Sequence, residues 1–103
     1  MRFEFHPEAL EEYLQATSWY TERDPSIALA FVESVEDAIQ RILDAPKRWR
    51  IIDEDIRRCL TRVFSYAILY TIEGDQGDYV LIVAVMHCSR EPDYWRTRIN
   101  RGL

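Results

Sequence analysis

Hydrophobic positions follow a helical period through the first half of this 103-residue chain. From Pro7 onward, apolar residues recur at steps of three and four, which predicts an amphipathic helix of about four turns. Its predicted apolar face consists of Leu10, Tyr13, Leu14, Thr17 and Tyr20. The predicted polar face consists mostly of Glu8, Glu11, Glu12 and Gln15.

A second helix is predicted to start at Pro25 and to end before Pro46. The Asp24 side chain can accept hydrogen bonds from the free N–H groups of the first turn, and Pro25 occupies a position that needs no donor. The apolar positions of this helix are Ile27, Phe31, Val35, Ala38, Ile39 and Ile42. Because only Thr21–Arg23 separate the two helices, we expect an antiparallel helical hairpin.

After Pro46 the hydrophobic period changes to two residues, which predicts β-strands. Three strands are predicted, at Arg57–Phe64, Tyr66–Glu73 and Tyr79–His87. A glycine-containing turn of hairpin length joins the last two. Both alternating sets of residues in Tyr79–Met86 are apolar, so we expect this strand to be covered on both faces.

Two short elements complete the expected order. Arg2–Phe5 is predicted as an N-terminal strand, and Asp93–Asn100 as a short C-terminal helix. The order β-α-α-β-β-β-α predicts an α+β fold, in which the helical hairpin packs on a mostly antiparallel sheet. The length, with 48% hydrophobic and 30% charged residues, fits a single domain over residues 1–103.

Charge is distributed unevenly along the chain. The net charge is -5, but residues 1–45 carry -7 and residues 46–103 carry +2. Of the 13 basic residues only Lys47 is a lysine. The acidic total argues against a general nucleic-acid binder. The arginine-rich second half indicates bidentate contacts to carboxylates or phosphates, or, alternatively, a solvated basic face.

The common motifs of enzymes and metal sites are absent from the sequence. It has no glycine-rich phosphate loop, no His-Glu-x-x-His pattern, no glycine-flanked serine and no metal-spaced cysteines. We therefore expect no cofactor and no metal. Cys59 and Cys88 are expected to be reduced thiols of a cytosolic protein. No apolar stretch is long enough to cross a bilayer, so no membrane insertion is expected.

The densest group of chemistry-bearing residues follows the last predicted strand. It comprises His87, Cys88, Ser89, Arg90, Glu91, Pro92, Asp93, Tyr94 and Trp95, followed by Arg96 and Arg98. Arg90 can bind a phosphate or a carboxylate, and Tyr94 and Trp95 offer flat faces to a base, a peptide or an arginine. The alternatives are a structural role for His87 and a packing role for Trp95. His6 is expected to cap the first helix.

The pattern His87-x-x-Arg90-x-Pro92-x-Tyr94-Trp95 resembles the C-terminal signature of the RelE/ParE superfamily of type II toxin–antitoxin toxins. Other similar segments are His6-Pro7-Glu8-Ala9, Trp19-Tyr20, Ala45-Pro46, Arg57-Arg58 and Phe64-Ser65-Tyr66-Ala67-Ile68-Leu69-Tyr70. The resemblance implies a helical hairpin on an antiparallel sheet. It also implies a cytoplasmic bacterial toxin that a cognate antitoxin neutralises in a hetero-oligomer, with a function in plasmid stabilization.

The superfamily has two main branches. RelE-like toxins cleave mRNA on the ribosome, whereas ParE-like toxins poison DNA gyrase without being enzymes. In the cleaving branch an arginine commonly follows the tyrosine of the central strand, where this chain has Ala67 after Tyr66. A second arginine commonly lies near the end of the last strand, where this chain offers Met86, His87 or Cys88. The missing cations and the net charge of -5 favour the ParE-like, non-catalytic branch.

Each branch implies different site residues. For a gyrase-binding toxin, the predicted target- or partner-binding residues are Arg58, Arg62, Arg90, Tyr94, Trp95 and Arg96. For a nuclease, the catalytic candidates are His87, Arg90 and Tyr94, with Arg58 and Arg62 holding phosphate. A third possibility is a non-toxic homologue that keeps only partner binding. We expect the antitoxin to dock on a sheet edge or in a groove beside the helices lined by Tyr13, Trp19, Tyr20 or Phe31.

Overall fold

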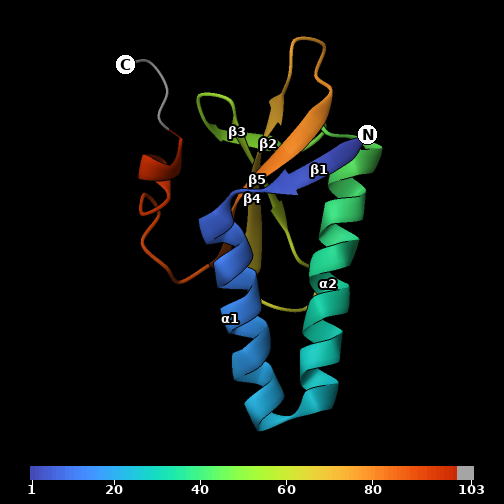
Figure 1. Ribbon diagram of the computed structural model, residues 1–103, viewed down its shortest axis with the longest axis vertical. Helices are drawn as coiled ribbons and strands as arrows, with labels where there is room; N and C mark the ends of the chain where they lie inside the picture. Colours follow the sequence, from blue (N-terminus) through green and yellow to red (C-terminus); the bar gives the residue numbers. More distant parts are fainter. Residues whose placement is uncertain (100–103) are drawn as a thin grey trace.

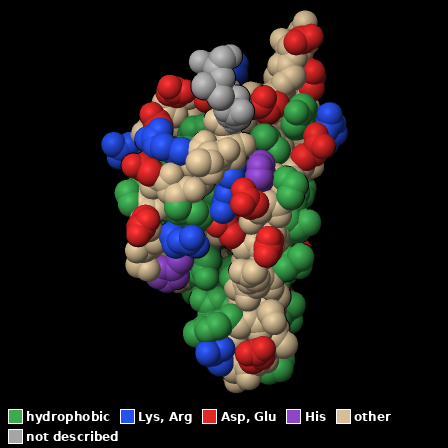
Figure 2. Space-filling view, turned by 60° about the vertical axis from the view of Figure 1, so that its left-hand side comes forward, with side chains coloured by type: hydrophobic (Ala, Val, Ile, Leu, Met, Phe, Trp, Pro, Cys, Tyr) green, Lys and Arg blue, Asp and Glu red, His purple; other side chains and the backbone are tan. Residues whose placement is uncertain are grey.

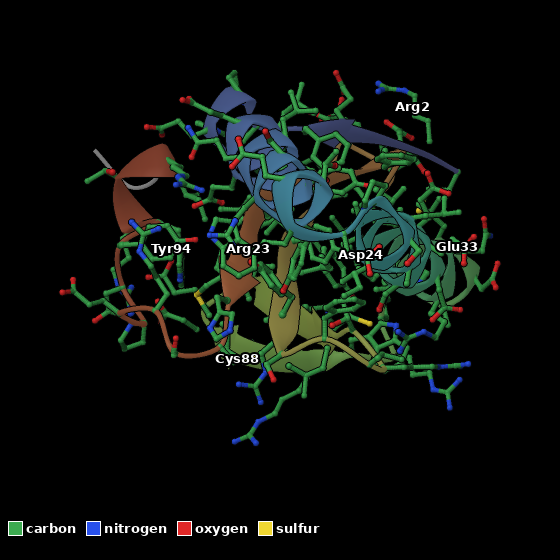
Figure 3. The ribbon with its side chains drawn as sticks, turned by 90° about the horizontal axis from the view of Figure 1, so that it is seen from below. Arg2, Arg23, Asp24, Glu33, Cys88 and Tyr94 are labelled. Atoms are coloured by element: carbon green, nitrogen blue, oxygen red, sulfur yellow. The ribbon has the colours of Figure 1, made fainter. Side chains whose placement is uncertain are left out.

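Two helices cover one face of a five-stranded sheet in the computed structural model, which describes residues 1–99 (Figure 1). The elements are β1 (Arg2–Phe5), α1 (Pro7–Arg23), α2 (Pro25–Asp44), β2 (Arg50–Asp53), β3 (Ile56–Leu60), β4 (Tyr66–Glu73), β5 (Tyr79–His87) and a 3-10 turn, η1 (Arg96–Arg98). Viewed along the helices, α1 and α2 lie side by side, and the segment that carries Tyr94 lies next to α1 (Figure 3). The predicted α+β class is confirmed.

The sheet has the strand order β1-β5-β4-β3-β2. All neighbouring strands are antiparallel except β1 and β5, which pair in parallel from Arg2 opposite Tyr79 to Phe5 opposite Ile82. The prediction of a mostly antiparallel sheet is therefore confirmed. Strand β5 is buried on both faces, as its two apolar sets predict, because Val83 packs in one hydrophobic cluster and Ile82 in the other.

Side-chain caps define where both helices begin. His6 Nδ1 accepts a hydrogen bond from the Glu8 N–H (3.1 Å), which confirms the capping interpretation of His6. Asp24 Oδ1 accepts from the Ser26 hydroxyl and N–H, and these bonds hold the pKa of Asp24 below its usual range. Helix α1 extends through Arg23, so the predicted three-residue connection is reduced to Asp24 alone, which caps both helices.

The buried stripe of α1 differs from the predicted one. Leu10 and Leu14 are 40% and 60% exposed, whereas the residues facing the core are Ala9, Tyr13, Ala16 and Tyr20. Small alanine side chains let the helix backbone approach β5 closely, and this approach turns the two leucines outward. The prediction of a solvent-facing Glu12 is also wrong, because its side chain is only 14% exposed.

The predicted strand Arg57–Phe64 is too long, since β3 ends at Leu60. Thr61 forms the turn that follows, with its N–H donating to Tyr66 O and its hydroxyl to Phe64 O. Arg62 and Phe64 therefore belong to a turn. Strand β2 was not predicted, because it has only four residues and two of its hydrophobic side chains are exposed.

The predicted C-terminal α-helix is wrong for the described residues. A turn over residues 92–95 leads into η1, and Asn100 lies outside the described part of the chain. The N–H of Arg96 donates to Asp93 O and that of Arg98 to Trp95 O, which is the three-residue step of a 3-10 turn.

Two hydrophobic clusters lie on opposite faces of the sheet. The cluster under the helices is built around Phe31, whose ring contacts those of Tyr13, Tyr20, Phe64 and Tyr66. The cluster on the far face comprises Ile56, Ala67, Leu69, Val83, Ala84 and Trp95. Within residues 1–99, neither helix has the length and apolarity needed to cross a membrane.

Substituting Phe31→Ala is expected to lower the free energy of unfolding by about 3 to 5 kcal/mol, because removal of the fully buried ring leaves a cavity among the rings that contact it. Leu29→Ala is the matched control in the same helix, since Leu29 is 60% exposed, and it should cost less than about 1 kcal/mol. Urea unfolding followed by circular dichroism measures both. Equal losses in the two variants would contradict the described core.

A maleimide added to the native protein is expected to modify Cys88 and leave Cys59 unmodified. Cys88 is exposed beyond the end of β5 (Figure 3), whereas Cys59 is fully buried and burial raises the pKa of its thiol. Intact-mass analysis should detect a second adduct only after denaturant is added. Similar labelling rates for the two thiols in the native protein would be inconsistent with this structure.

Candidate functional site

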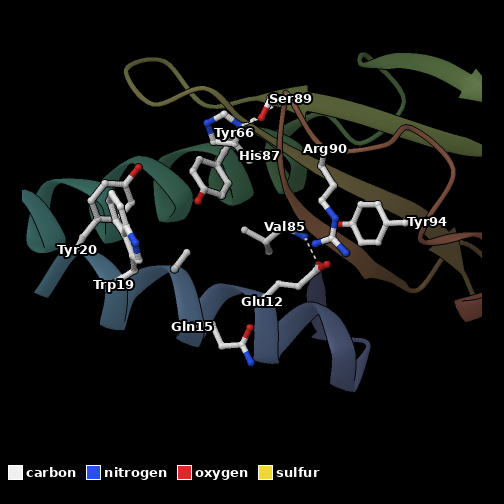
Figure 4. Close-up of a pocket in the computed structure, with 11 residues that line it drawn as sticks. Glu12, Gln15, Trp19, Tyr20, Tyr66, Val85, His87, Ser89, Arg90 and Tyr94 are labelled. Atoms are coloured by element: carbon white, nitrogen blue, oxygen red, sulfur yellow. Dashed lines mark hydrogen bonds between the residues drawn. The ribbon is translucent and has the colours of Figure 1, made fainter. Parts of the chain in front are cut away.

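A hollow of about 490 Å³ opens between α1 and the C-terminal end of β5 (Figure 4). We call it the α1–β5 groove. Its lining comes from α1, from the ends of β4 and β5 and from the following turn, and comprises Glu12, Gln15, Ala16, Trp19, Tyr20, Tyr66, Val85, His87, Ser89, Arg90 and Tyr94. The face of the molecule that carries α1 and the C-terminal segment has hydrophobic side chains next to basic ones and a histidine (Figure 2).

Aromatic rings form one end of the groove. Trp19 and Tyr20 pack edge to face, with ring centroids 5.0 Å apart. The Tyr66 ring contacts the buried Phe31 on one side and His87 on the other, at 4.9 and 5.2 Å. Burial, together with the neighbouring Tyr20 hydroxyl, raises the pKa of Tyr66, so its phenol stays neutral at physiological pH. This end of the groove is suited to an apolar or flat group.

A tight turn after β5 carries the polar rim. The Arg90 N–H donates to His87 O (2.9 Å), and the Ser89 N–H donates to His87 Nδ1 (3.1 Å). Because Nδ1 is the acceptor, a neutral His87 carries its proton on Nε2. The Ser89 hydroxyl also lies 2.6 Å from Nδ1 (Figure 4). The rim therefore presents a histidine ring fixed in orientation by its own turn.

Arg90 lies against the Tyr94 ring, with its Cζ 4.0 Å from the ring centroid. Arg98 lies 4.9 Å from the same centroid. Burial, followed by the nearby Glu12 carboxylate, raises the pKa of Tyr94. Arg90 is exposed and forms no ion pair with any residue in 1–99. It is therefore a positioned cation whose charge is available to a ligand.

A largely buried ion pair fixes the wall of the groove. Arg98 donates from Nη1 to Glu12 Oε1 and from Nη2 to Glu12 Oε2, both at 2.8 Å, and from Nη1 to Val83 O at 3.0 Å. Glu12 Oε1 also accepts from the Val85 N–H at 3.1 Å. The hydrogen bonds that Arg98 donates to Glu12 raise the pKa of Arg98. This arrangement, the Glu12–Arg98 clamp, joins α1, β5 and the C-terminal segment.

The structure brings three predicted site residues together. His87, Arg90 and Tyr94, the catalytic candidates of the nuclease alternative, all line the α1–β5 groove. Two predicted groove aromatics, Trp19 and Tyr20, lie there as well. The others do not, because Phe31 is fully buried and Tyr13 packs against the core.

Other predicted site residues lie on the opposite face of the sheet. Arg58, Trp95 and Arg96 line a second hollow of about 200 Å³ with Ile52, Asp53, Met86, Pro92 and Asp93. We call it the far-face hollow. Trp95 is only 2% exposed and packs in the far-face cluster, as the packing alternative expected. Hydrogen bonds to Asp93 and Asp53 raise the pKa of Arg96, so carboxylates already neutralise that cation.

Arg62 lies in neither hollow. Its Nε is 3.6 Å from an Asp37 carboxylate oxygen, which places it at the base of α2. The predicted partner-binding residues are therefore divided among three locations.

Sequence reasoning missed Glu12 and gave Arg98 no role. One signal was present: Glu12 is one helical turn before Ala16 and two before Tyr20, which both face inward. Among residues 1–99, no three His, Cys, Asp or Glu side chains gather where they could hold a metal ion. The groove's chemistry therefore consists of aromatic surface, a fixed imidazole and an unpaired guanidinium.

Substituting Glu12→Gln is expected to lower the free energy of unfolding by about 2 to 3 kcal/mol, because the buried Arg98 guanidinium loses its counter-charge. Glu11→Gln is the matched control from the adjacent, exposed position and should change stability little. Thermal and urea unfolding of both variants test this. Unchanged stability in Glu12→Gln would show that the clamp contributes nothing.

The chain was compared with known proteins. Residues 3–92 match the family model described as ParE toxin of type II toxin-antitoxin system, parDE. No curated protein matches the chain. The matched segment contains both helices, strands β2 to β5, most of β1 and the turn that carries Arg90. Because the match covers most of the sequence, the chain belongs to the ParE toxin family of type II toxin–antitoxin systems.

Proposed function

We propose that this chain is a toxin that inhibits DNA gyrase by binding it, and that a cognate antitoxin neutralises it in the bacterial cytoplasm. Membership of the ParE toxin family supports the toxin assignment. The choice of gyrase over the ribosome rests on the chemistry of the far face of the sheet.

The observation that most supports gyrase over the ribosome is the pair Ala67 and Met86. These residues lie directly opposite each other on β4 and β5. Ala67 lies where the RNA-cleaving branch commonly has an arginine, and Met86 is one of three residues, with His87 and Cys88, at the place of its second arginine. Here Ala67 is fully buried, and both side chains contact the cluster that contains Trp95. A phosphoryl transition state is stabilised mainly by fixed positive charge, and an apolar surface cannot supply it. The far face therefore favours binding over RNA cleavage.

The nuclease alternative has one observation in its favour, the gathering of His87, Arg90 and Tyr94 in the α1–β5 groove. Its proposed phosphate-holding residues lie elsewhere. Arg58 lines the far-face hollow and Arg62 pairs with Asp37. An RNA phosphate held by these arginines would not meet the groove residues, so the nuclease set is divided among three locations.

The predicted cationic contacts lie on several faces of the protein. A single protein partner such as gyrase can still bind them, because an extended protein surface can contact side chains that are far apart. Arg58 and Arg90 are the predicted contacts without an ion pair in residues 1–99. Trp95 contributes to target binding indirectly, because its buried ring anchors the segment that carries Tyr94 and Arg96 to the sheet. We expect Arg58 and Arg90 to contribute more to target binding than Arg62 or Arg96.

Purified protein is expected to inhibit supercoiling of relaxed plasmid DNA by bacterial DNA gyrase, and prior mixing with the antitoxin should restore it. Induced expression without antitoxin should give filamentous cells with damaged DNA. The same cultures provide the control, since mapped mRNA ends should show no new codon-phased cleavage. Normal supercoiling at saturating protein would refute gyrase inhibition. New codon-phased mRNA ends would then identify the protein as a nuclease. Harmless expression without antitoxin would identify it as a non-toxic homologue.

A further inference from the structure

We propose that the α1–β5 groove binds an acidic segment of the antitoxin, with one carboxylate on Arg90 and a neighbouring apolar side chain against Trp19 and Tyr66. This inference rests on the proposed function in one respect, namely that an antitoxin partners this toxin. It adds the location of a contact and the chemistry of the segment that makes it.

The Arg90 side chain is preorganised to bind a carboxylate in the unbound protein. Stacking on the Tyr94 ring fixes the guanidinium plane, and exposure leaves its N–H groups free to donate in pairs. The neighbouring arginines differ, because Arg96 is bound to Asp53 and Asp93, and Arg98 to Glu12. Among these three, only Arg90 retains an uncompensated charge within residues 1–99.

The local charge of the groove is positive although the chain is acidic. Among residues 1–99, Glu12 is the only acidic residue in the lining, and both of its oxygens are occupied by Arg98. His87 adds an Nε2–H donor close to Arg90, because its Nδ1 is held by Ser89. A carboxylate that enters here meets two donors and no free anion.

The aromatic end provides the second contact. Trp19 is 51% exposed, and Arg23 covers one of its faces with Cζ 3.5 Å from the ring centroid. Tyr66 completes this surface between Trp19 and His87 (Figure 4). A ligand with an apolar side chain next to its carboxylate fits both ends of the groove, which favours a peptide over a simple anion.

The charge of α1 disfavours nucleic acid as the occupant. Besides Glu12, this helix carries Glu8, Glu11 and Glu22. A polyanion running along the groove would meet this acidic helix over its length, whereas a single carboxylate on Arg90 would not. We therefore assign the groove to a peptide segment.

The test uses the purified cognate antitoxin. Arg90→Gln should weaken its binding about 10- to 100-fold in calorimetry, as expected for a lost charge-assisted pair. Arg50→Gln, which alters an exposed arginine of β2 outside the groove, is the matched control and should bind like the wild type. Because Arg90 is exposed and unpaired, Arg90→Gln should unfold at the wild-type temperature.

A charge reversal identifies the partner group. Arg90→Glu should bind poorly, and replacing one acidic residue of the antitoxin by lysine, each tested in turn, should restore affinity. Wild-type affinity in Arg90→Gln, or the same loss in Arg50→Gln, would overturn the proposal. An oligouridylate that displaces the antitoxin from the wild type but not from Arg90→Gln would also overturn it and assign the groove to RNA. Gyrase inhibition is measured separately by the supercoiling assay. If the protein fails to inhibit gyrase, the antitoxin-binding measurement still tests the role of Arg90.

Discussion

The Glu12–Arg98 clamp is the contact on which the groove depends. It joins side chains 86 positions apart and also engages the backbone at Val83 and Val85. Without it, the segment after β5 would be held to the sheet mainly by the Tyr94 and Trp95 rings, which pack on the far-face cluster. Because a largely buried charge is costly unless paired, each partner keeps the other in place. The same pairing removes the only acidic group from the groove and leaves Arg90 as its dominant charge.

The sheet separates polar and aromatic residues from apolar residues that are adjacent to them in the sequence. Alternation along β4 and β5 directs Tyr66 and His87 toward the helices, and Ala67 and Met86 toward Trp95. Residues adjacent in sequence therefore belong to different faces. One face is an aromatic groove with the unpaired Arg90, and the other is mostly an apolar cluster, next to which Arg96 is neutralised by Asp53 and Asp93. In a toxin of the ParE family, this division favours recognition of protein surfaces over chemistry on RNA.

Most of the fold could be predicted because it is encoded locally. The two helices, the Asp24-Pro25 cap and the apolar run of β5 depend mainly on neighbouring residues, and all three are confirmed. The grouping of His87, Arg90 and Tyr94 followed from one short turn. The errors have a different origin. The inward position of Glu12 depends on a partner near the other end of the chain, and the end of β3 depends on bonds made by Thr61. The end of β3 leaves no periodic signal, and the helical spacing of Glu12 to Ala16 and Tyr20 does not by itself identify Arg98 as its partner.

The parallel pairing of β1 with β5 has a consequence for the order in which the protein becomes functional. The hydrogen bonds between β1 and β5 can form only after residues 79–82 have been synthesised. The groove likewise requires both α1 and the turn after β5. A chain still emerging from the ribosome can form its helical hairpin early, because those contacts are local. Its binding surface is assembled only when nearly the whole sequence has been made. Synthesis of nearly the whole chain therefore precedes formation of the groove.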